Sequence, residues 1–235
     1  MNSLKIFNYE VVDSTNRVAR DYVSDGGILP ALFIAEEQTA GRGRLGRSFF
    51  SPKASGLYMT LALPFDNTSE QVALTVAVSV AAVRVLSPLT DKKLTVKWVN
   101  DILADGKKAA GILCEAVKGA VIIGIGINLS TEKFPEDIET TASSLGIIEV
   151  DKKLLSEKIA EEIIKITKEN NADIIEEYKK ISAVLGEEIY YIKNGERFDA
   201  RALDIDEKGS LIALNSDGTK VTLNSGEITL RIKPE

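Results

Sequence analysis

The sequence has 235 residues, a formal net charge of -6, 44% hydrophobic residues and no histidine. This composition is typical of a globular protein with a substantial core, and the acidic balance argues against a general nucleic-acid binder, so we expect no nucleic-acid partner. The lack of histidine excludes Ser-His-Asp and Cys-His nucleophile arrangements and histidine-ligated zinc. Any catalysis must therefore use lysine, arginine, carboxylates, backbone dipoles or a hard metal ion such as Mg²⁺.

The chain shows no sign of export or of membrane insertion. Its one cysteine, Cys114, excludes an internal disulfide framework and suits a reducing compartment. Residues 1–10 lack the pattern of a secretory signal. The most apolar stretch, residues 72–86, is interrupted by polar side chains and is too short to span a bilayer. We expect a cytoplasmic protein with no membrane partner.

A cluster of small polar residues follows the first predicted strand, residues 5–12. Asp13-Ser-Thr-Asn16 lies where an amphipathic helix begins, as the helical spacing of Val18, Ala19 and Tyr22 indicates. Taken alone, Ser14, Thr15 and Asn16 favour helix capping, and the alternative is a strand-to-helix turn that presents hydroxyls and an amide to a polar ligand. Both explanations can hold together.

The Arg/Gly loop, residues 38–47, follows a short apolar strand at residues 31–35. Its core, Gly41-Arg-Gly-Arg-Leu-Gly-Arg47, places three arginines and three glycines within seven residues. Glycine permits close approach of the backbone to a ligand, and arginine offers a planar fork of donors for carboxylates and phosphates. The loop is therefore either an anion clamp or a solvated basic surface. Phe49, just after it, is either core or one wall of a ligand slot.

The middle of the chain predicts a buried helix followed by an antiparallel meander. A capping-box pattern begins at Thr68, and the nearly all-apolar helix at residues 71–86 ends before Pro88. Residues 94–104 have the composition of a strand but contain Asn100-Asp101, which a core strand tolerates only at a bulge or a site. Asp105-Gly106 then predicts a hairpin into strands at residues 107–117 and 120–128.

Two alternate glycines, Gly124 and Gly126, lie in the last of these strands. They resemble part of a dinucleotide fingerprint, but the third glycine and a following helix are missing, which argues against that interpretation. Alternate glycines in a central strand more naturally leave one face bare for a flat ligand.

The C-terminal part changes from helices to short strands. Asp151 is a predicted cap for a helix at residues 154–166, and a second helix at residues 174–184 is expected to end at Gly186. Strands separated by tight turns follow. We predict an α+β fold with a mixed, largely antiparallel sheet and packed helices in residues 1–185, and a small β-barrel in residues 186–235.

Five separated segments share a polar, glycine-rich character. They are Asp13-Ser-Thr-Asn16, Gln38 with Gly41-Arg-Gly-Arg-Leu-Gly-Arg47, Lys97-Trp-Val-Asn-Asp101, Lys107-Lys-Ala-Ala-Gly-Ile-Leu-Cys-Glu115 and Ile123-Gly-Ile-Gly-Ile-Asn128. In this order and spacing they closely resemble the motifs of biotin protein ligases. Gly226-Glu-Ile-Thr-Leu-Arg231 resembles the end of that family's C-terminal domain. The resemblance covers essentially the whole chain and implies a class II synthetase-like catalytic domain with an SH3-like barrel.

The resemblance also implies the reaction. Biotin and Mg·ATP would form biotinyl-5′-AMP and pyrophosphate, and a lysine of a biotin carboxyl carrier protein domain would then take the biotin. Attack of a carboxylate on a phosphate brings anions together, so the site needs fixed cations. Lys108, Arg42 and Arg44 would supply them as the catalytic residues.

The resemblance assigns two groups of binding residues. The biotin-binding residues would be Ser14, Thr15, Asn16, Gln38, Gly41, Arg42, Gly43, Arg44, Lys108, Gly111, Gly124 and Gly126. The ATP-binding residues would be Arg42, Arg44, Phe49, Lys97, Trp98, Asn100, Asp101, Lys108 and Asn128, with Asp101 as the ligand of Mg²⁺. Glu115 matches the motif but is equally compatible with a structural role.

Val99 departs from the family, which usually has proline there and hence a more rigid turn. We expect the ligase-only form, because no helix-turn-helix pattern precedes Lys5, and a homodimer, because family members are often dimeric.

The sequence is also compatible with two other functions. A lipoate- or octanoyl-type ligase or transferase shares the fold and a catalytic lysine, although the complete Arg/Gly loop argues against it. A non-enzymatic biotin- or nucleotide-binding regulator would bind ligand without releasing pyrophosphate.

Overall fold

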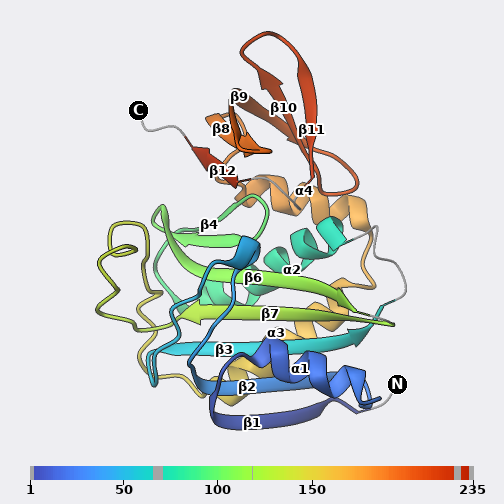
Figure 1. The fold of residues 1–235 in the computed structure, drawn as a ribbon, viewed down its shortest axis with the longest axis vertical. Coiled ribbons are helices and arrows are strands. Elements are labelled where there is room, and N and C mark those ends of the chain that lie inside the picture. The colour runs from blue at the N-terminus through green and yellow to red at the C-terminus, as the bar shows by residue number, and fades with distance from the viewer. Residues whose placement is uncertain (1–2, 66–70, 118, 225–228, 233–235) are drawn as a thin grey trace.

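The computed structural model describes residues 3–65, 71–117, 119–224 and 229–232. The capping pattern predicted at Thr68 and the start of the terminal motif at Gly226 lie outside these residues. Within them the chain forms two sheets and four α-helices (Figure 1).

The larger sheet has seven strands in the order β1-β2-β3-β7-β6-β5-β4. β1 and β2 pair in parallel, and every other neighbouring pair is antiparallel. The predicted mixed, largely antiparallel sheet is therefore confirmed. The strands are β1 (Lys5–Val12), β2 (Ala31–Gln38), β3 (Gly56–Pro64), β4 (Leu94–Lys97), β5 (Asp101–Ala104), β6 (Lys107–Val117) and β7 (Ala120–Asn128).

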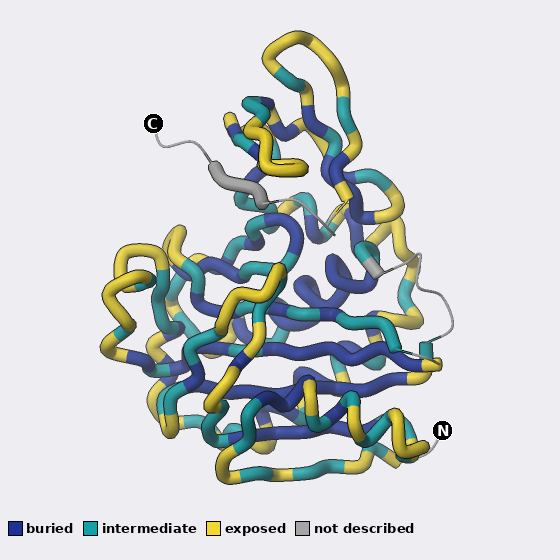
Figure 2. Tube along the Cα trace, in the orientation of Figure 1, coloured by how far each residue is buried: buried dark blue, intermediate teal, exposed yellow. Residues whose placement is uncertain are grey.

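Helices cover both faces of this sheet. α1 (Thr15–Ser24) lies on one face against β2, β3 and β7, while α2 (Gln71–Leu86) and α3 (Lys152–Ile166) lie on the other (Figure 1). α4 (Asn171–Ile181) packs against α2 and β4 beside the smaller sheet. The central strands are buried from both sides, as Figure 2 shows by their dark blue colour. The α1 face carries the functional motifs, so we call it the site face.

α2 is the most apolar element of the chain. The window Val72–Leu89 has a mean hydropathy of 2.0 and would be long enough to cross a membrane, but 61% of it is buried inside the protein. Its small side chains, Ala77, Val80 and Ala81 among them, are almost completely buried in the main core cluster. A core helix passes the same test of length and composition.

The stretch predicted as one interrupted strand forms two. β4 and β5 pair with each other, with Lys97 opposite Asp101, and a tight turn at residues 98–100 joins them. The peptide bond between Trp98 and Val99 in this turn is cis. The hairpin predicted at Asp105-Gly106 is confirmed, because both residues have the positive φ angles, 50° and 81°, that such a turn requires.

The C-terminal strands form an antiparallel sheet in the order β11-β10-β9-β8-β12. They are β8 (Glu188–Lys193), β9 (Glu196–Ile205), β10 (Leu211–Asn215), β11 (Lys220–Leu223) and β12 (Thr229–Ile232). The predicted helix end at Gly186 is wrong. α4 already ends at Ile181 with Ser182 as its cap, and Gly186 instead donates its backbone N–H to the Ala202 carbonyl.

The two sheets are joined by a turn of the C-terminal part. Gly209 accepts a hydrogen bond from the indole nitrogen of Trp98 at 2.9 Å. A Cβ on Gly209 would lie 3.2 Å from the backbone of Ala73 and 3.1 Å from Val76, both in α2. The turn is therefore fitted tightly between α2 and the turn at residues 98–100 that joins β4 to β5.

We predict that Gly209→Ala lowers the free energy of unfolding by about 2–4 kcal/mol, because the φ of +79° disfavours a side chain and the new methyl crowds α2. Gly218→Ala is the matched control, since its φ is +85° but nothing lies within 4 Å of its added Cβ. Urea unfolding of both variants measures the difference. Equal losses of stability would contradict the tight junction.

Candidate functional site

The five motif segments meet on the site face and form two adjoining pockets. The inner pocket lies between the start of α1, the Arg/Gly loop and the middle of β6 and β7. Its walls are formed by Ser14, Thr15, Asn16, Gln38, Arg42, Gly43, Arg44, Phe49, Met59, Asn100, Lys108, Gly111, Ile112, Leu113, Gly124, Ile125 and Gly126.

The outer pocket lies beyond Phe49, between the hairpin of β5 and β6 and the loop that follows β7. Among the residues that line it are Lys97, Asp101, Asn128, Phe134 and Asp137. Lys108 and Phe49 line both pockets, so their side chains mark the boundary between them. A ligand that occupied both pockets would have to pass Lys108.

The buried end of the inner pocket, around Thr15 and Gln38, is formed by a network of hydrogen bonds. Gln38 accepts hydrogen bonds from the backbone N–H and the hydroxyl of Thr15 at 2.9 and 3.1 Å. The Thr60 hydroxyl lies 2.8 Å from that of Thr15 and donates to Asn16 Oδ1 at 2.7 Å. Ser14 occupies the N-cap position of α1, but its side chain makes no cap hydrogen bond. Capping therefore does not account for this cluster of hydroxyls.

The network continues into the Arg/Gly loop. Gln38 Nε2 donates to the Ser51 hydroxyl at 3.0 Å, and Ser51 donates to the Phe49 carbonyl at 2.9 Å. The polar end of the pocket and the aromatic residue at its mouth are thus held by one chain of hydrogen bonds.

The glycines of the sheet have different neighbours. Gly111 and Gly126 are cross-strand partners, and the Phe49 ring lies against both. A Cβ on Gly126 would lie 2.5 Å from that ring, which leaves no room for a side chain. We expected Gly124 to leave space for a flat ligand, but the Asn16 side chain occupies that space. A Cβ added to Gly124 would lie 2.0 Å from Asn16 Oδ1.

The Arg/Gly loop is closed by its own backbone, since Gly43 N–H donates to the Arg47 carbonyl at 2.8 Å. Arg44 turns inward and donates to Asn100 Oδ1 at 3.0 Å. Its other terminal nitrogen, Nη2, is buried and has no hydrogen-bond partner in the described part of the chain. Burial lowers the pKa of this guanidinium, against the opposing charge of Asp101. A desolvated cation with an unused donor is suited to an anion.

Lys108 forms an ion pair with Asp101, with Nζ 2.7 Å from Oδ1. Its Nζ also lies 5.8 Å from the centroid of the Phe49 ring. Lys107, the neighbouring lysine, is exposed and lines only the outer pocket. The structure thus distinguishes the two lysines.

The chemistry of the outer pocket is compatible with a metal bound together with phosphates. Asp101 and Asp137 both line it, whereas the described residues contain no group of three or more carboxylates or cysteines that could hold a metal alone. Mg²⁺ in nucleotide sites is usually held by one or two carboxylates together with substrate phosphates and water. Asp101 is therefore suited to binding Mg²⁺ together with phosphate oxygens, rather than to a site formed by protein ligands alone.

Three predicted residues differ in placement. Trp98 lines neither pocket: it is 4% exposed, and its indole nitrogen donates to the Gly209 carbonyl. Gly41 lines neither pocket, and its added Cβ would lie 2.4 Å from the Phe49 carbonyl, which places it in the stem of the loop. Asn100, expected at the nucleotide, lines the inner pocket with Arg44.

Lys97 and Asn128 are in the outer pocket as expected, and Asn128 also donates its amide to the Ser143 carbonyl at 3.0 Å. Sequence reasoning missed the apolar side chain of Leu113 in the wall of the inner pocket and the bridging hydroxyl of Thr60. Met59, Ile112 and Ile125 also border this pocket, but their side chains pack in the core on the other face of the sheet. Strand alternation from Gly111 would have indicated Leu113. No local signal marks the outer-pocket residues Phe134 and Asp137.

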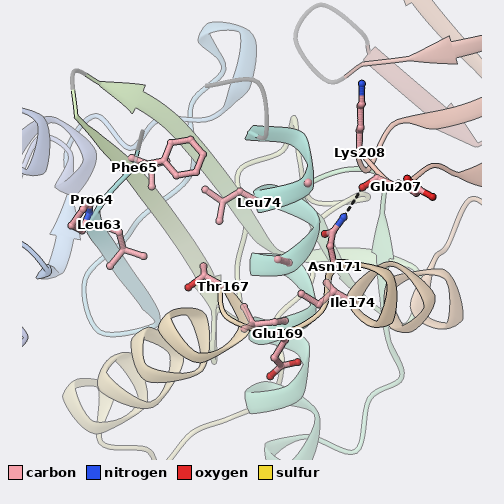
Figure 3. Close-up of a pocket in the computed structure, with 14 residues that line it drawn as sticks. Leu63, Pro64, Phe65, Leu74, Thr167, Glu169, Asn171, Ile174, Glu207 and Lys208 are labelled. Carbon is pink, nitrogen blue, oxygen red and sulfur yellow. Dashed lines mark hydrogen bonds between the residues drawn. The ribbon is translucent and has the colours of Figure 1, made fainter. Parts of the chain in front are cut away.

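Another cleft lies on the far side of the molecule, between α2, the α3–α4 connection and the turn at Glu207 (Figure 3). Leu63, Phe65 and Leu74 form its apolar part, and Asn171 donates to the Glu207 carbonyl across it at 2.6 Å. It contains none of the residues predicted for the site.

Comparison with known proteins agrees with the geometry. The model of the biotin/lipoate A/B protein ligase family matches residues 9–132, which include all five motif segments. The chain belongs to this family. A second model, that of the biotin protein ligase C terminal domain, matches residues 184–231.

Individual relatives show the same similarity. The chain is 35% identical to the bifunctional ligase/repressor BirA of Bacillus spizizenii, in an alignment that covers 58% of this chain and 45% of that protein, so it spans less than half of that relative's length. It is 29% identical to the biotin–[acetyl-CoA-carboxylase] ligase of Mycobacterium tuberculosis, over 92% of this chain and 83% of that protein. The biotin protein ligase from Aquifex aeolicus in complex with biotin and ATP superposes with a TM-score of 0.83 at 27% identity, covering 97% and 99% of the two chains.

We predict that Thr60→Val lowers the free energy of unfolding by about 1–3 kcal/mol, because it removes the hydroxyl between Thr15 and Asn16 and leaves buried polar atoms without a partner. Thr222→Val, at an exposed strand position, should change it by less than about 0.5 kcal/mol. Chemical denaturation of both variants gives these values. A Thr60→Val protein as stable as the wild type would show that the network is not held by this residue.

Proposed function

We propose that this chain is a biotin protein ligase, which activates biotin with ATP to biotinyl-5′-AMP and transfers the biotin to a lysine of a biotin carboxyl carrier protein domain. The observation that carries the proposal is the position of Lys108 at the boundary of two pockets of different character. The family membership and the similarity to the Aquifex aeolicus ligase, described with biotin and ATP, support it.

The inner pocket is suited to biotin. Its buried end offers the hydroxyls and amides of Ser14, Thr15 and Gln38, and its walls include the apolar side chains of Leu113 and Phe49. Biotin has a polar ureido group on a fused ring and an apolar chain that ends in a carboxylate. With the ureido group at the buried end, that carboxylate would point toward Lys108 and Arg44.

The outer pocket is suited to ATP. Lys97 and Lys107 supply positive charge, and Phe49 and Phe134 supply aromatic surface. The α-phosphate would lie beside Lys108, opposite the carboxylate that attacks it. Asn128 lines the same pocket and would contact the sugar or the base.

The first step forms a bond between a biotin carboxylate oxygen and the α-phosphorus, while the bond to the bridging oxygen of the pyrophosphate breaks. Two anions must approach each other, and the transition state spreads negative charge over the phosphate oxygens. Lys108 and the unpartnered Arg44 Nη2 can stabilise this charge because neither requires reorganisation of bulk water. In the second step the neutral amine of the carrier lysine attacks the acyl carbon, AMP leaves, and the amine proton passes to solvent.

Mg²⁺ is part of the proposal, with Asp101 as its protein ligand. When bound with ATP, the ion neutralises charge on the phosphates and makes the phosphorus more reactive. Lys108 would then exchange its ion pair with Asp101 for the acyl phosphate. We also propose that the chain works in the cytoplasm as a homodimer, without a nucleic-acid or membrane partner.

The proposal is tested by incubating the protein with ATP, Mg²⁺, labelled biotin and a biotin carboxyl carrier domain. We expect label on the acceptor lysine of the carrier and biotin-dependent release of pyrophosphate, and an excess of lipoate should not compete. Neither transfer nor release of pyrophosphate would refute the proposed function, and competition by lipoate would refute the choice of biotin.

We predict that Lys108→Ala lowers the rate of biotin adenylation by about 10²–10³-fold, in line with loss of one preorganised charge donor. Lys107→Ala is the matched control, because the neighbouring lysine lines only the outer pocket. Its rate should stay within a few-fold of the wild type. Biotin-dependent exchange of pyrophosphate into ATP measures both, and equal rates in the two variants would remove Lys108 from the mechanism.

Arg44→Gly should accelerate the release of biotinyl-5′-AMP by about 10–100-fold, since a charge-assisted hydrogen bond contributes roughly 1.5–3 kcal/mol. The retention time of the intermediate on the protein, followed by filtration after adenylation, measures this. Unchanged retention would show that Arg44 does not hold the intermediate.

A further inference from the structure

Glu115 lies in β6, outside the walls of the inner pocket, yet it contacts a residue that forms them. Its Oε2 accepts a hydrogen bond from Asn16 Nδ2 at 2.9 Å. Its Oε1 accepts one from Arg20 Nη2 at 2.6 Å in an ion pair whose side chains are 21% and 39% exposed for Glu115 and Arg20. Glu115 thus connects a charged residue at the rim of α1 to the buried polar network.

This contact determines which way the Asn16 amide faces. A carboxylate can only accept hydrogen bonds, so Asn16 must direct its NH₂ group to Glu115 and its oxygen to Thr60. The oxygen in turn requires the single proton of the Thr60 hydroxyl. The Thr60 hydroxyl then has no proton left for Thr15, 2.8 Å away, and the Thr15 hydroxyl donates its own proton to Gln38 Oε1 at 3.1 Å.

The consequence reaches the pocket at Thr15. With its proton directed into the protein, the Thr15 oxygen keeps its lone pairs for the pocket, where Thr15 forms part of the wall. If the Asn16 amide were reversed, its NH₂ group would donate to Thr60, and the Thr60 proton would turn to Thr15. One lone pair of Thr15 would then be filled from within the protein, and the pocket would offer one acceptor fewer.

We propose that Glu115 is a positioning residue that sets the hydrogen-bond polarity of the inner pocket through Asn16 and Thr60, so that Thr15 is presented as an acceptor to a ligand N–H group. The inference rests on the proposed function, in which the ureido N–H groups of biotin are such donors. It assigns to Glu115 a role in the selection of the ligand rather than in the chemical step.

The ion pair with Arg20 determines which way a glutamine at position 115 would face. In Glu115→Gln, the one oxygen of the new amide is attracted to the charged Arg20, which leaves its NH₂ group facing Asn16 and reverses the Asn16 amide. In Glu115→Gln combined with Arg20→Ala, the oxygen is free to face Asn16 again. The second substitution should therefore restore what the first one loses.

We expect Glu115→Gln to weaken biotin binding about 10-fold, as for the loss of one hydrogen bond. The turnover rate at saturating biotin and the KM for ATP should change by less than about twofold. The double variant should return to within about threefold of the wild-type affinity. Glu36→Gln is the matched control, because it breaks a 2.9 Å ion pair with Lys152 of α3 on the opposite face of the sheet. It should leave biotin binding unchanged.

Isothermal titration with biotin and steady-state kinetics measure these values. Unchanged affinity in Glu115→Gln, or a double variant as weak as Glu115→Gln alone, would overturn the inference while leaving the proposed function intact. A wild-type protein that does not bind biotin would overturn the proposed function itself.

Discussion

The structure of the site depends on the register between β6 and β7. Antiparallel partners share a face of the sheet, and this register puts Gly111 opposite Gly126 and Leu113 opposite Gly124. The three glycines therefore lie together on one face of the sheet, where the Phe49 ring packs against Gly111 and Gly126 and the Asn16 side chain packs against Gly124. A slip of one residue would turn Ile125 and Ile127 to this face and fill both pockets. The buried hydrophobic side of the same strands, packed under α2, prevents that slip.

A second constraint is the way in which Arg44 and Lys108, the two cations of the site, are held. Arg44 is held inward by Asn100, and Asn100 is itself held by the Ile112 carbonyl of β6 at 2.9 Å. The sheet therefore positions a cation through two hydrogen bonds, without burying a complementary carboxylate beside it. Lys108 has such a carboxylate in Asp101, but the pair is partly exposed and is worth little by itself. Both cations are thus available to an anionic ligand, Lys108 at small cost in stability and Arg44 at the cost of a buried donor that has no partner among the described residues.

Much of the fold and of the site could be predicted because the relevant signals are local. The alternation of β6 and β7, the turn at Asp105-Gly106 and the cap at Asp151 each lie within a few residues, and the structure confirms them. The motif residues around Ser14, Gln38 and Lys108 converge on one pocket as expected.

The errors arise where a contact joins segments far apart in the chain. The indole nitrogen of Trp98 donates a hydrogen bond to the carbonyl of Gly209, 111 residues away, and no local pattern predicts that partner. Gly124 is small because Asn16 needs the space, which depends on the position of α1 over the sheet. Thr60 looks like any strand threonine until its two neighbours are known. The role of Glu115 likewise depends on two residues of α1 that its own motif does not contain.

The central claim is that the two pockets are the ends of one site whose reacting atoms meet at Lys108. A crystal structure of the protein with a non-hydrolysable analogue of biotinyl-5′-AMP tests it most directly. We expect the ring system against Thr15 and Gln38, the nucleotide beyond Phe49, and Lys108 Nζ moved from Asp101 to the acyl-phosphate linkage. An analogue confined to one pocket, or a Lys108 that stays paired with Asp101 and away from the linkage, would contradict the account.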